Sequence, residues 1–346
     1  MKSKKWLSAV LFLGLAALTF YVIFKNQDID ELFEAVRNMH KGYLCLAVTT
    51  ALFFVSAEGI LIWYMLRALE EKVSFWGSLK YAFIGFFYSG ITPSATGGQP
   101  MQLYHMSKDG YKIGHSTVVL LSAAVFYKLV LVLMGIGICI FWWTGLRTHL
   151  GDYLPIYFLG LFLNAALVVA LLAVMLNGPG MEKFLCRAEA RLVKMHLLQS
   201  SETRQAQIHT MIAQYHNAVQ FLKTHVKSLL FLMLITILQR CAVFGLTYFV
   251  YRGLGLSGTN AFVIMALQAV VYISVDMLPL PGSQGITEVM YAAVFGKIFT
   301  GSSLMVSMCI SRGLNFYLPL LISACVAAWS WWHKNRNTVE NKEKEL

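Results

Sequence analysis

The chain has 346 residues, of which 58% are hydrophobic and only 13% are charged. So few charges exclude a soluble globular protein of this length and indicate an all-α polytopic membrane protein. The net charge of +11 does not indicate a nucleic-acid partner, because most Lys and Arg residues stand beside apolar runs, where basic residues set membrane topology.

The first predicted element is an uncharged apolar run at 6–24, which is long enough to span a membrane. Lys2, Lys4 and Lys5 precede it, as in a signal peptide, but no small-residue cleavage site follows. We therefore interpret this run as a retained anchor. Five further apolar runs predict full spans, at 43–66, 116–143, 154–176, 228–251 and 303–332.

Two other apolar segments, near 79–110 and 259–299, are interrupted by proline and glycine. The polar loop 177–226 is basic and amphipathic, so we expect it to be cytoplasmic, to lie on anionic lipid and to share its side with both termini. Counting spans from that side makes each interrupted segment a re-entrant hairpin. If both segments crossed fully, the protein would instead have eight spans.

The hairpin interpretation predicts internal symmetry. Residues 43–143 and 228–330 would each form a span, a hairpin and a span, in opposite orientations, within one membrane domain covering 1–346. Inverted repeats whose broken helices meet near the midplane are a recurring architecture of secondary transporters. The alternative is a chance similarity between two apolar stretches.

The two interruptions share proline, glycine and a Gly-x-Gln ending, at 92–100 and 278–285. Broken backbone at membrane depth persists only inside protein or beside a wet cavity. Helix halves starting after Gly98 and Gly285 would present free backbone N–H groups to an anionic head group. The alternative is that these residues only kink packed helices. Polar side chains at the interruptions add neutral ligands: Ser94, Thr96, Gln99, Ser283 and Gln284.

Charged residues also occur in or beside the predicted spans, where each costs about 2.5–3.5 kcal/mol at the bilayer centre. They are three cations and three acids: Lys128, Arg240, Arg312, Glu58, Asp276 and Glu288. We expect the cations to bind a lipid phosphate and the acids to balance charge or couple to protons. The alternative is structural ion pairs, such as one between Glu58 and Arg240.

No motif indicates a metal site, a cofactor or an enzyme. The histidines of 177–226 lack the H-E-x-x-H spacing, and the six cysteines lack C-x-x-C spacing. We therefore expect no metal, no cofactor and no catalytic residue.

The stretches 90–104 (GITPSATGGQPMQLY) and 278–288 (LPLPGSQGITE) resemble the flippase-like transmembrane domain of lysylphosphatidylglycerol synthases, also called multiple peptide resistance factors. The resemblance covers nearly the whole chain. It implies a bacterial plasma-membrane protein that moves phosphatidylglycerol-type or lysyl-phosphatidylglycerol lipids and supports resistance to cationic peptides. Full-length members add a soluble aminoacyltransferase domain, whereas this sequence ends at Leu346, so we expect a stand-alone form that is not itself an enzyme.

Two alternatives stay open beside the flippase. The chain could be the membrane part of a phosphatidylglycerol lysyltransferase system, in which a separate soluble aminoacyltransferase partner transfers lysine from lysyl-tRNA. It could also be a non-transporting scaffold for envelope enzymes, in which case the intramembrane cations would be replaceable.

Overall fold

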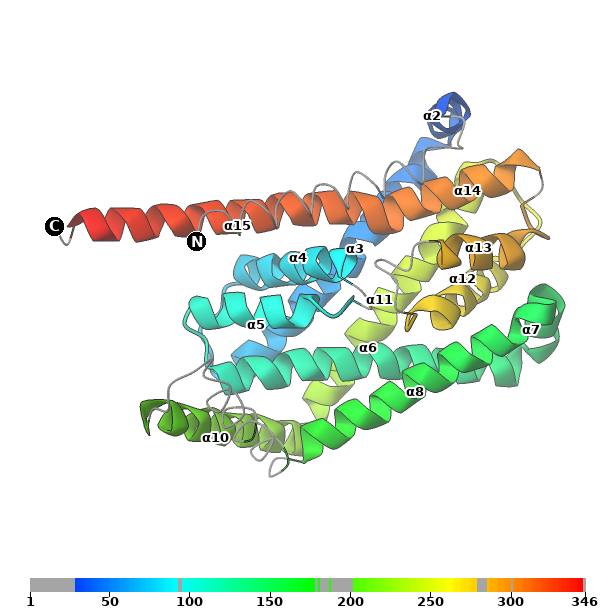
Figure 1. Cartoon of the computed structure of the whole chain (residues 1–346). Helices are drawn as coiled ribbons and strands as arrows, with labels where there is room; N and C mark the ends of the chain where they lie inside the picture. Colours follow the sequence, from blue (N-terminus) through cyan, green and yellow to red (C-terminus); the bar gives the residue numbers. More distant parts are fainter. Residues whose placement is uncertain are drawn as a thin grey trace.

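The computed structural model describes residues 29–92, 95–177, 180, 187, 202–278, 285–299 and 301–344, and its regular elements are all helices (Figure 1). The predicted span 6–24 lies outside the described residues, as do Ser94, Ser283 and Gln284. Within the described part, five helices are long and apolar enough to cross a membrane. The predicted all-α polytopic membrane fold is therefore confirmed.

These five helices correspond to five of the predicted spans. Their bounds differ from the predicted ones by a few residues, and the third is preceded by a short helix α7 (Trp143–Leu150) and a turn of 3₁₀ helix. The five are α3 (Lys41–Ala68), α6 (Ile113–Phe141), α8 (Leu154–Leu176), α11 (Val226–Gly253) and the run Ser302–Trp332. Long uncharged runs specify such helices because lipid offers no partner to an unpaired backbone group.

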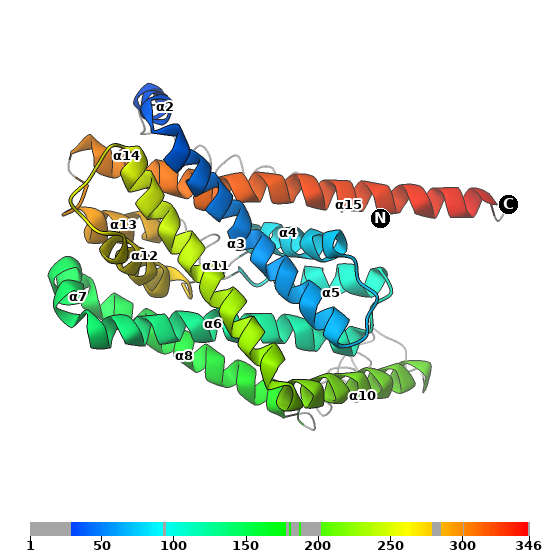
Figure 2. The same cartoon turned by 180° about the vertical axis from the view of Figure 1, so that it is seen from behind.

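The two interrupted segments form pairs of short helices. The first pair is α4 (Phe75–Ile91) and α5 (Gly98–Lys108), and the second is α12 (Ala261–Val275) and α13 (Ile286–Phe295). Within each pair the helices pack against each other, and the two pairs enter the molecule from opposite ends (Figures 1 and 2). Because the two helices of each pair pack against each other, each segment forms a helical hairpin, which favours the predicted re-entrant arrangement.

The order long, short, short, long occurs twice along the chain. It runs α3, α4, α5, α6 and then α11, α12, α13 and the final long run. The first helices of the two sets, α3 and α11, pack closely against each other (Figure 2). The predicted repeats, 43–143 and 228–330, stay a prediction, and this helix order is the observation that favours them.

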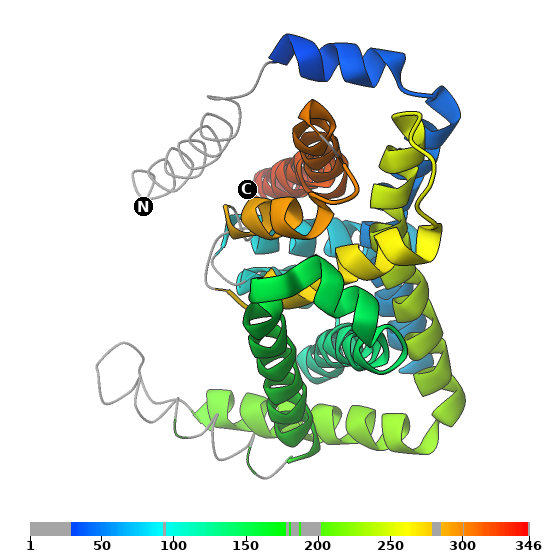
Figure 3. The same ribbon diagram turned by 90° about the vertical axis from the view of Figure 1, so that its right-hand side faces the viewer.

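The last long run is not a uniform α-helix. It consists of α14 (Ser302–Arg312), a π-helix η4 (Gly313–Tyr317) and α15 (Leu318–Lys344). Pro319 explains the interruption, because its ring clashes with the carbonyl of Asn315 in a regular α-helix and its nitrogen donates no hydrogen bond. The matching helix α6 is continuous. Figure 3 looks nearly along both α6 and α15, and α11 crosses them.

Helix α10 (Glu202–Thr224) lies at one end of the molecule, against the start of α6. Its buried face is a stripe at helical spacing: Ile212, Tyr215, Ala218, Val219 and Leu222. Burial raises the pKa of the Tyr215 phenol, which stays protonated and donates to the carbonyl of Met175 at 3.0 Å. The apolar face expected from the sequence is thus covered by the protein, and contact of 177–226 with anionic lipid stays a prediction.

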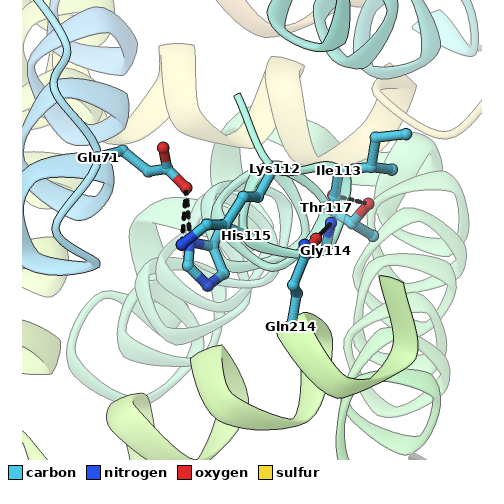
Figure 4. Close-up of polar contacts among 7 residues, drawn as sticks. All are labelled: Glu71, Lys112, Ile113, Gly114, His115, Thr117 and Gln214. Carbon is cyan, nitrogen blue, oxygen red and sulfur yellow. Dashed lines mark hydrogen bonds and ion pairs between the residues drawn. The ribbon is translucent and has the colours of Figure 1, made fainter. Parts of the chain in front are cut away.

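Polar contacts join this end of the molecule (Figure 4). His115 Nδ1 lies 2.8 Å from Glu71 Oε1, and the backbone N–H of Gly114 donates to Gln214 Oε1 at 3.4 Å. A Cβ at position 114 would lie 2.5 Å from the carbonyl oxygen of Met211, so only glycine allows α6 and α10 to approach this closely. The loop after α3, the start of α6 and α10 are therefore held together.

Candidate functional site

The first predicted cation, Lys128, lies near the middle of α6. Its Nζ donates to Asp276 Oδ2, just past the end of α12, and to the sulfur of Met277 at 3.5 Å. The two charged side chains are only 15% and 16% exposed. This ion pair therefore joins the first set of helices to the second, across 148 positions of sequence.

The second predicted cation, Arg312, ends α14 immediately before the π-helix. Its Nε donates to Glu288 Oε1 at 3.0 Å, and its guanidinium lies 5.1 Å from the centre of the Phe316 ring. Glu288 stands in the first turn of α13, where the helix dipole favours a carboxylate. This pair lies within the second set of helices.

The third predicted cation, Arg240 of α11, is completely buried, with 0% of its surface exposed. Its guanidinium carbon stands 3.2 Å above the centre of the Tyr127 ring. Among the described residues, none of its three side-chain nitrogens has a hydrogen-bond partner. The ion pair between Glu58 and Arg240, considered above as a structural alternative, does not form in the described part of the chain.

Glu58 of α3 is instead bound by an amide. Gln102 of α5 donates through Nε2 to Glu58 Oε1 at 2.6 Å and to the carbonyl of Tyr81 at 3.2 Å. The amide fits because residue 85 of α4 is glycine, where a Cβ would lie 2.2 Å from Gln102 Nε2. Gln102 was not predicted as a site residue from the sequence, although it follows Gln99 by three residues, on the adjacent turn of one helix.

The six charged residues are connected through two tyrosines. Tyr127 lies within electrostatic reach of Arg240, Asp276 and Glu58. Tyr272 of α12 lies within reach of Arg312, Arg240 and Asp276. Through these two tyrosines and the two ion pairs, six charges form one electrostatically linked group, which we call the central charge cluster: Glu58, Lys128, Arg240, Asp276, Glu288 and Arg312. Tyr127 was not singled out from the sequence, although its position beside an intramembrane lysine is a usable signal.

Two of the five predicted neutral ligands, Thr96 and Gln99, are described, and both are exposed. Gln99 is exposed and donates to the carbonyl of Leu120 at 3.4 Å, and Thr96 lies exposed in the turn before α5. Ser94, Ser283 and Gln284 lie outside the described residues. The helix halves expected after Gly98 and Gly285 begin at Gly98 and Ile286.

Hydrogen bonds of Thr92 hold the end of α4 close to the start of α5. The hydroxyl of Thr92 accepts from the backbone N–H of Gly97 at 2.8 Å and donates to the carbonyl of Tyr88 at 2.7 Å. A Cβ on Gly98 would lie 2.7 Å from the carbonyl oxygen of Gly85, so glycine is required for α4 and α5 to meet here. The hairpin is thus tightly closed.

No group of three or more His, Cys, Asp or Glu side chains within the described ranges could hold a metal ion. The absence of metals and cofactors stays a prediction.

The sequence model of the family described as "Lysylphosphatidylglycerol synthase TM region" matches residues 6–323 of this chain. The chain is also similar to a UPF0104 membrane protein of Archaeoglobus fulgidus, with 21% identity over 89% of this chain and 93% of the relative. A UPF0104 membrane protein of Pyrococcus horikoshii is 24% identical over 76% of this chain and 81% of the relative.

Proposed function

The chain belongs to the lysylphosphatidylglycerol synthase TM region family, and from this premise we propose that it is a flippase that carries a phospholipid across the membrane. Its substrate is phosphatidylglycerol or an aminoacylated form such as lysyl-phosphatidylglycerol. The head group passes through the middle of the protein while the acyl chains stay in the bilayer.

The central charge cluster is the observation that carries this proposal. Its residues come from four long apolar runs and from the second hairpin, at positions where charges are retained mainly for function. Cations bind the phosphate and acids balance their charge or exchange protons. The proposed head-group residues are Lys128, Arg240, Arg312, Ser94, Thr96, Gln99, Ser283 and Gln284, with Glu58, Asp276 and Glu288 as the acids.

Transport then requires the two sets of helices to move relative to each other. The Lys128–Asp276 pair joins them, and a passing head group competes for both partners. Rocking of one repeat against the other around broken helices is a known route to alternating access. In this proposal, opening of the pair accompanies the passage of each lipid.

We also propose where the protein lies and what it contacts. The protein lies in the bacterial plasma membrane with both termini in the cytoplasm, and the basic segment 177–226 faces anionic lipid. It supports resistance to cationic peptides by moving a lipid that lowers the negative surface charge. A soluble aminoacyltransferase partner is a second candidate, favoured by the synthase in the family's description.

The test is lipid transport in proteoliposomes containing fluorescent phosphatidylglycerol or lysyl-phosphatidylglycerol. Wild type should move at least one lipid faster than empty liposomes, and Lys128→Ala and Arg312→Ala should lose this activity. Lys80→Ala is a matched control, because Lys80 pairs with Asp109 away from the central charge cluster. A folded wild type that moves neither lipid would leave the partner-dependent enzyme or the scaffold as the better explanation.

A further inference from the structure

Arg240 differs from the other two cations of the central charge cluster. Lys128 and Arg312 each donate to a carboxylate, whereas the guanidinium of Arg240 has no hydrogen-bond partner among the described residues. It is also the most buried of the three, at 0% exposure. Within the described part of the chain, Arg240 is therefore a fully buried cation whose side-chain nitrogens have no hydrogen-bond partner.

An unpaired buried guanidinium is unfavourable, and arginine cannot relieve the cost by losing its proton. A buried lysine can become neutral by losing its proton, but arginine stays protonated in proteins. Stacking on Tyr127 stabilises the face of the cation, but a neutral phenol supplies no negative charge to balance it. The N–H groups of Arg240 need an acceptor that carries negative charge.

The carboxylates of the cluster are already engaged. Asp276 accepts from Lys128, Glu288 accepts from Arg312, and Glu58 accepts from Gln102. None of these acids lies within ion-pair distance of Arg240 in the described part of the chain. No carboxylate of the cluster therefore supplies the anion that Arg240 lacks.

We infer that Arg240 is the binding site for one phosphate group, held through the edge of the guanidinium while its face rests on Tyr127. The planar fork of arginine matches two oxygens of a phosphate. This chemistry is shared by the phosphodiester of a lipid head group and by free phosphate. The inference rests on the proposed function and deepens it, because it makes Arg240 the primary phosphate contact, whereas Lys128 and Arg312 reach the head group only when their carboxylate pairs open.

Binding can be measured directly on the full chain in a non-ionic maltoside detergent and a phosphate-free buffer. The probes are short-chain phosphatidylglycerol, inorganic phosphate and, as the uncharged control, short-chain diacylglycerol. Arg240→Gln should weaken binding of the lipid about 10- to 100-fold, as expected for losing charge-assisted hydrogen bonds. Arg240→Lys keeps the charge without the fork and should fall between Arg240→Gln and wild type.

Arg252→Gln is the matched control, because Arg252 lies in the last turn of the same helix and stacks on Tyr43, away from the cluster. It should bind the lipid as wild type does. Equal binding by Arg240→Gln and wild type, or equal losses at positions 240 and 252, would overturn the inference.

A second measurement needs no variant, and so it holds even if Arg240→Gln does not fold. Phosphatidylglycerol should raise the thermal midpoint of the wild type, and diacylglycerol should not. A rise with inorganic phosphate as well would identify a site open to free phosphate, and a rise with the lipid alone would identify a head-group site. If neither anion raises the midpoint, Arg240 does not bind phosphate.

The same preparations separate this inference from the proposed function. Wild type that binds phosphatidylglycerol through Arg240 but does not move it in proteoliposomes would support the anion site and contradict transport. Transport that is unchanged in Arg240→Gln would contradict the anion site and leave transport standing.

Discussion

The two sets of helices use corresponding charges differently. In the first set, Lys128 extends from the continuous helix α6 to Asp276 in the other set. In the second set, Arg312 stands beside a π-helix and pairs with Glu288 of its own set. Cations at similar positions in the helix order therefore form different ion pairs. The Lys128–Asp276 pair, which we call the link, joins the two sets, and the Arg312–Glu288 pair, which we call the internal brace, lies within the second set. Only the first of these two pairs holds the two sets of helices together.

The largest expected effect comes from breaking the link. Lys128→Ala leaves Asp276 buried without its partner, so it should lower the free energy of unfolding by about 3 kcal/mol. Lys128→Met combined with Asp276→Leu removes both charges and should recover most of that loss without recovering transport. Thermal melts of Lys128→Met, Asp276→Leu and the double variant measure the coupling. Additive losses would show that the two side chains do not stabilise each other.

A second test compares close packing in the two sets. Gly85→Ala places a methyl group against the Gln102 amide, which should cost about 1–3 kcal/mol and displace the amide from Glu58. The control is Gly245→Ala in α11, where the nearest atom lies 3.9 Å from the added Cβ. This change should be neutral or stabilise by up to about 1 kcal/mol. Similar melting midpoints for both variants would contradict the described α4–α5 contact.

Removing the charge of the internal brace should lower the free energy of unfolding less than breaking the link. Glu288→Gln keeps the shape and a hydrogen-bond acceptor for Arg312, and Glu288 is 25% exposed, so we expect a loss of about 1–2 kcal/mol. Its effect on thermal stability should be smaller than that of Lys128→Ala under the same conditions. The reverse order would mean that the brace, and not the link, is the stronger pair.

The smallest effect on stability is expected at the π-helix. Pro319→Ala removes the ring that opposes a regular α-helix, so it should change the free energy of unfolding by less than about 1 kcal/mol. Transport should nevertheless fall, because a regular helix would rotate Arg312 relative to Glu288. Leu320→Ala, one position later, tests whether the transport defect is specific to the proline. Unchanged transport in Pro319→Ala would show that the π-helix has no role in movement.

The spans and the hairpins could be predicted because their signals are local. The length of an uncharged run decides whether a helix can cross a membrane, and proline and glycine decide where it breaks. The run 154–176 illustrates this, since its predicted bounds are those of α8. The π-helix also had a local signal in Pro319, which our sequence analysis did not use.

The pairing of charges could not be predicted in the same way. Which carboxylate meets Lys128 depends on how α6 and α12 pack, and no pattern within either segment specifies that choice. The sequence likewise did not show that Gln102, and not Gln99, contacts Glu58, because the rotation of α5 about its axis decides which amide faces the carboxylate. The sequence therefore predicted which residues to examine, and packing between distant helices determined their partners.

The connection between α10 and α11 limits how far the molecule can move. Helix α10 packs on α6, but it is joined to α11 through the single residue His225, whose ring stacks on Phe221 at 3.9 Å. A one-residue connection has only two freely rotating backbone torsions, so the two helices can move little relative to each other. Displacement of α11 away from α6 must therefore be taken up at His225 or by detaching α10. In the proposed transport cycle, we therefore expect a smaller opening at this end than at the opposite one.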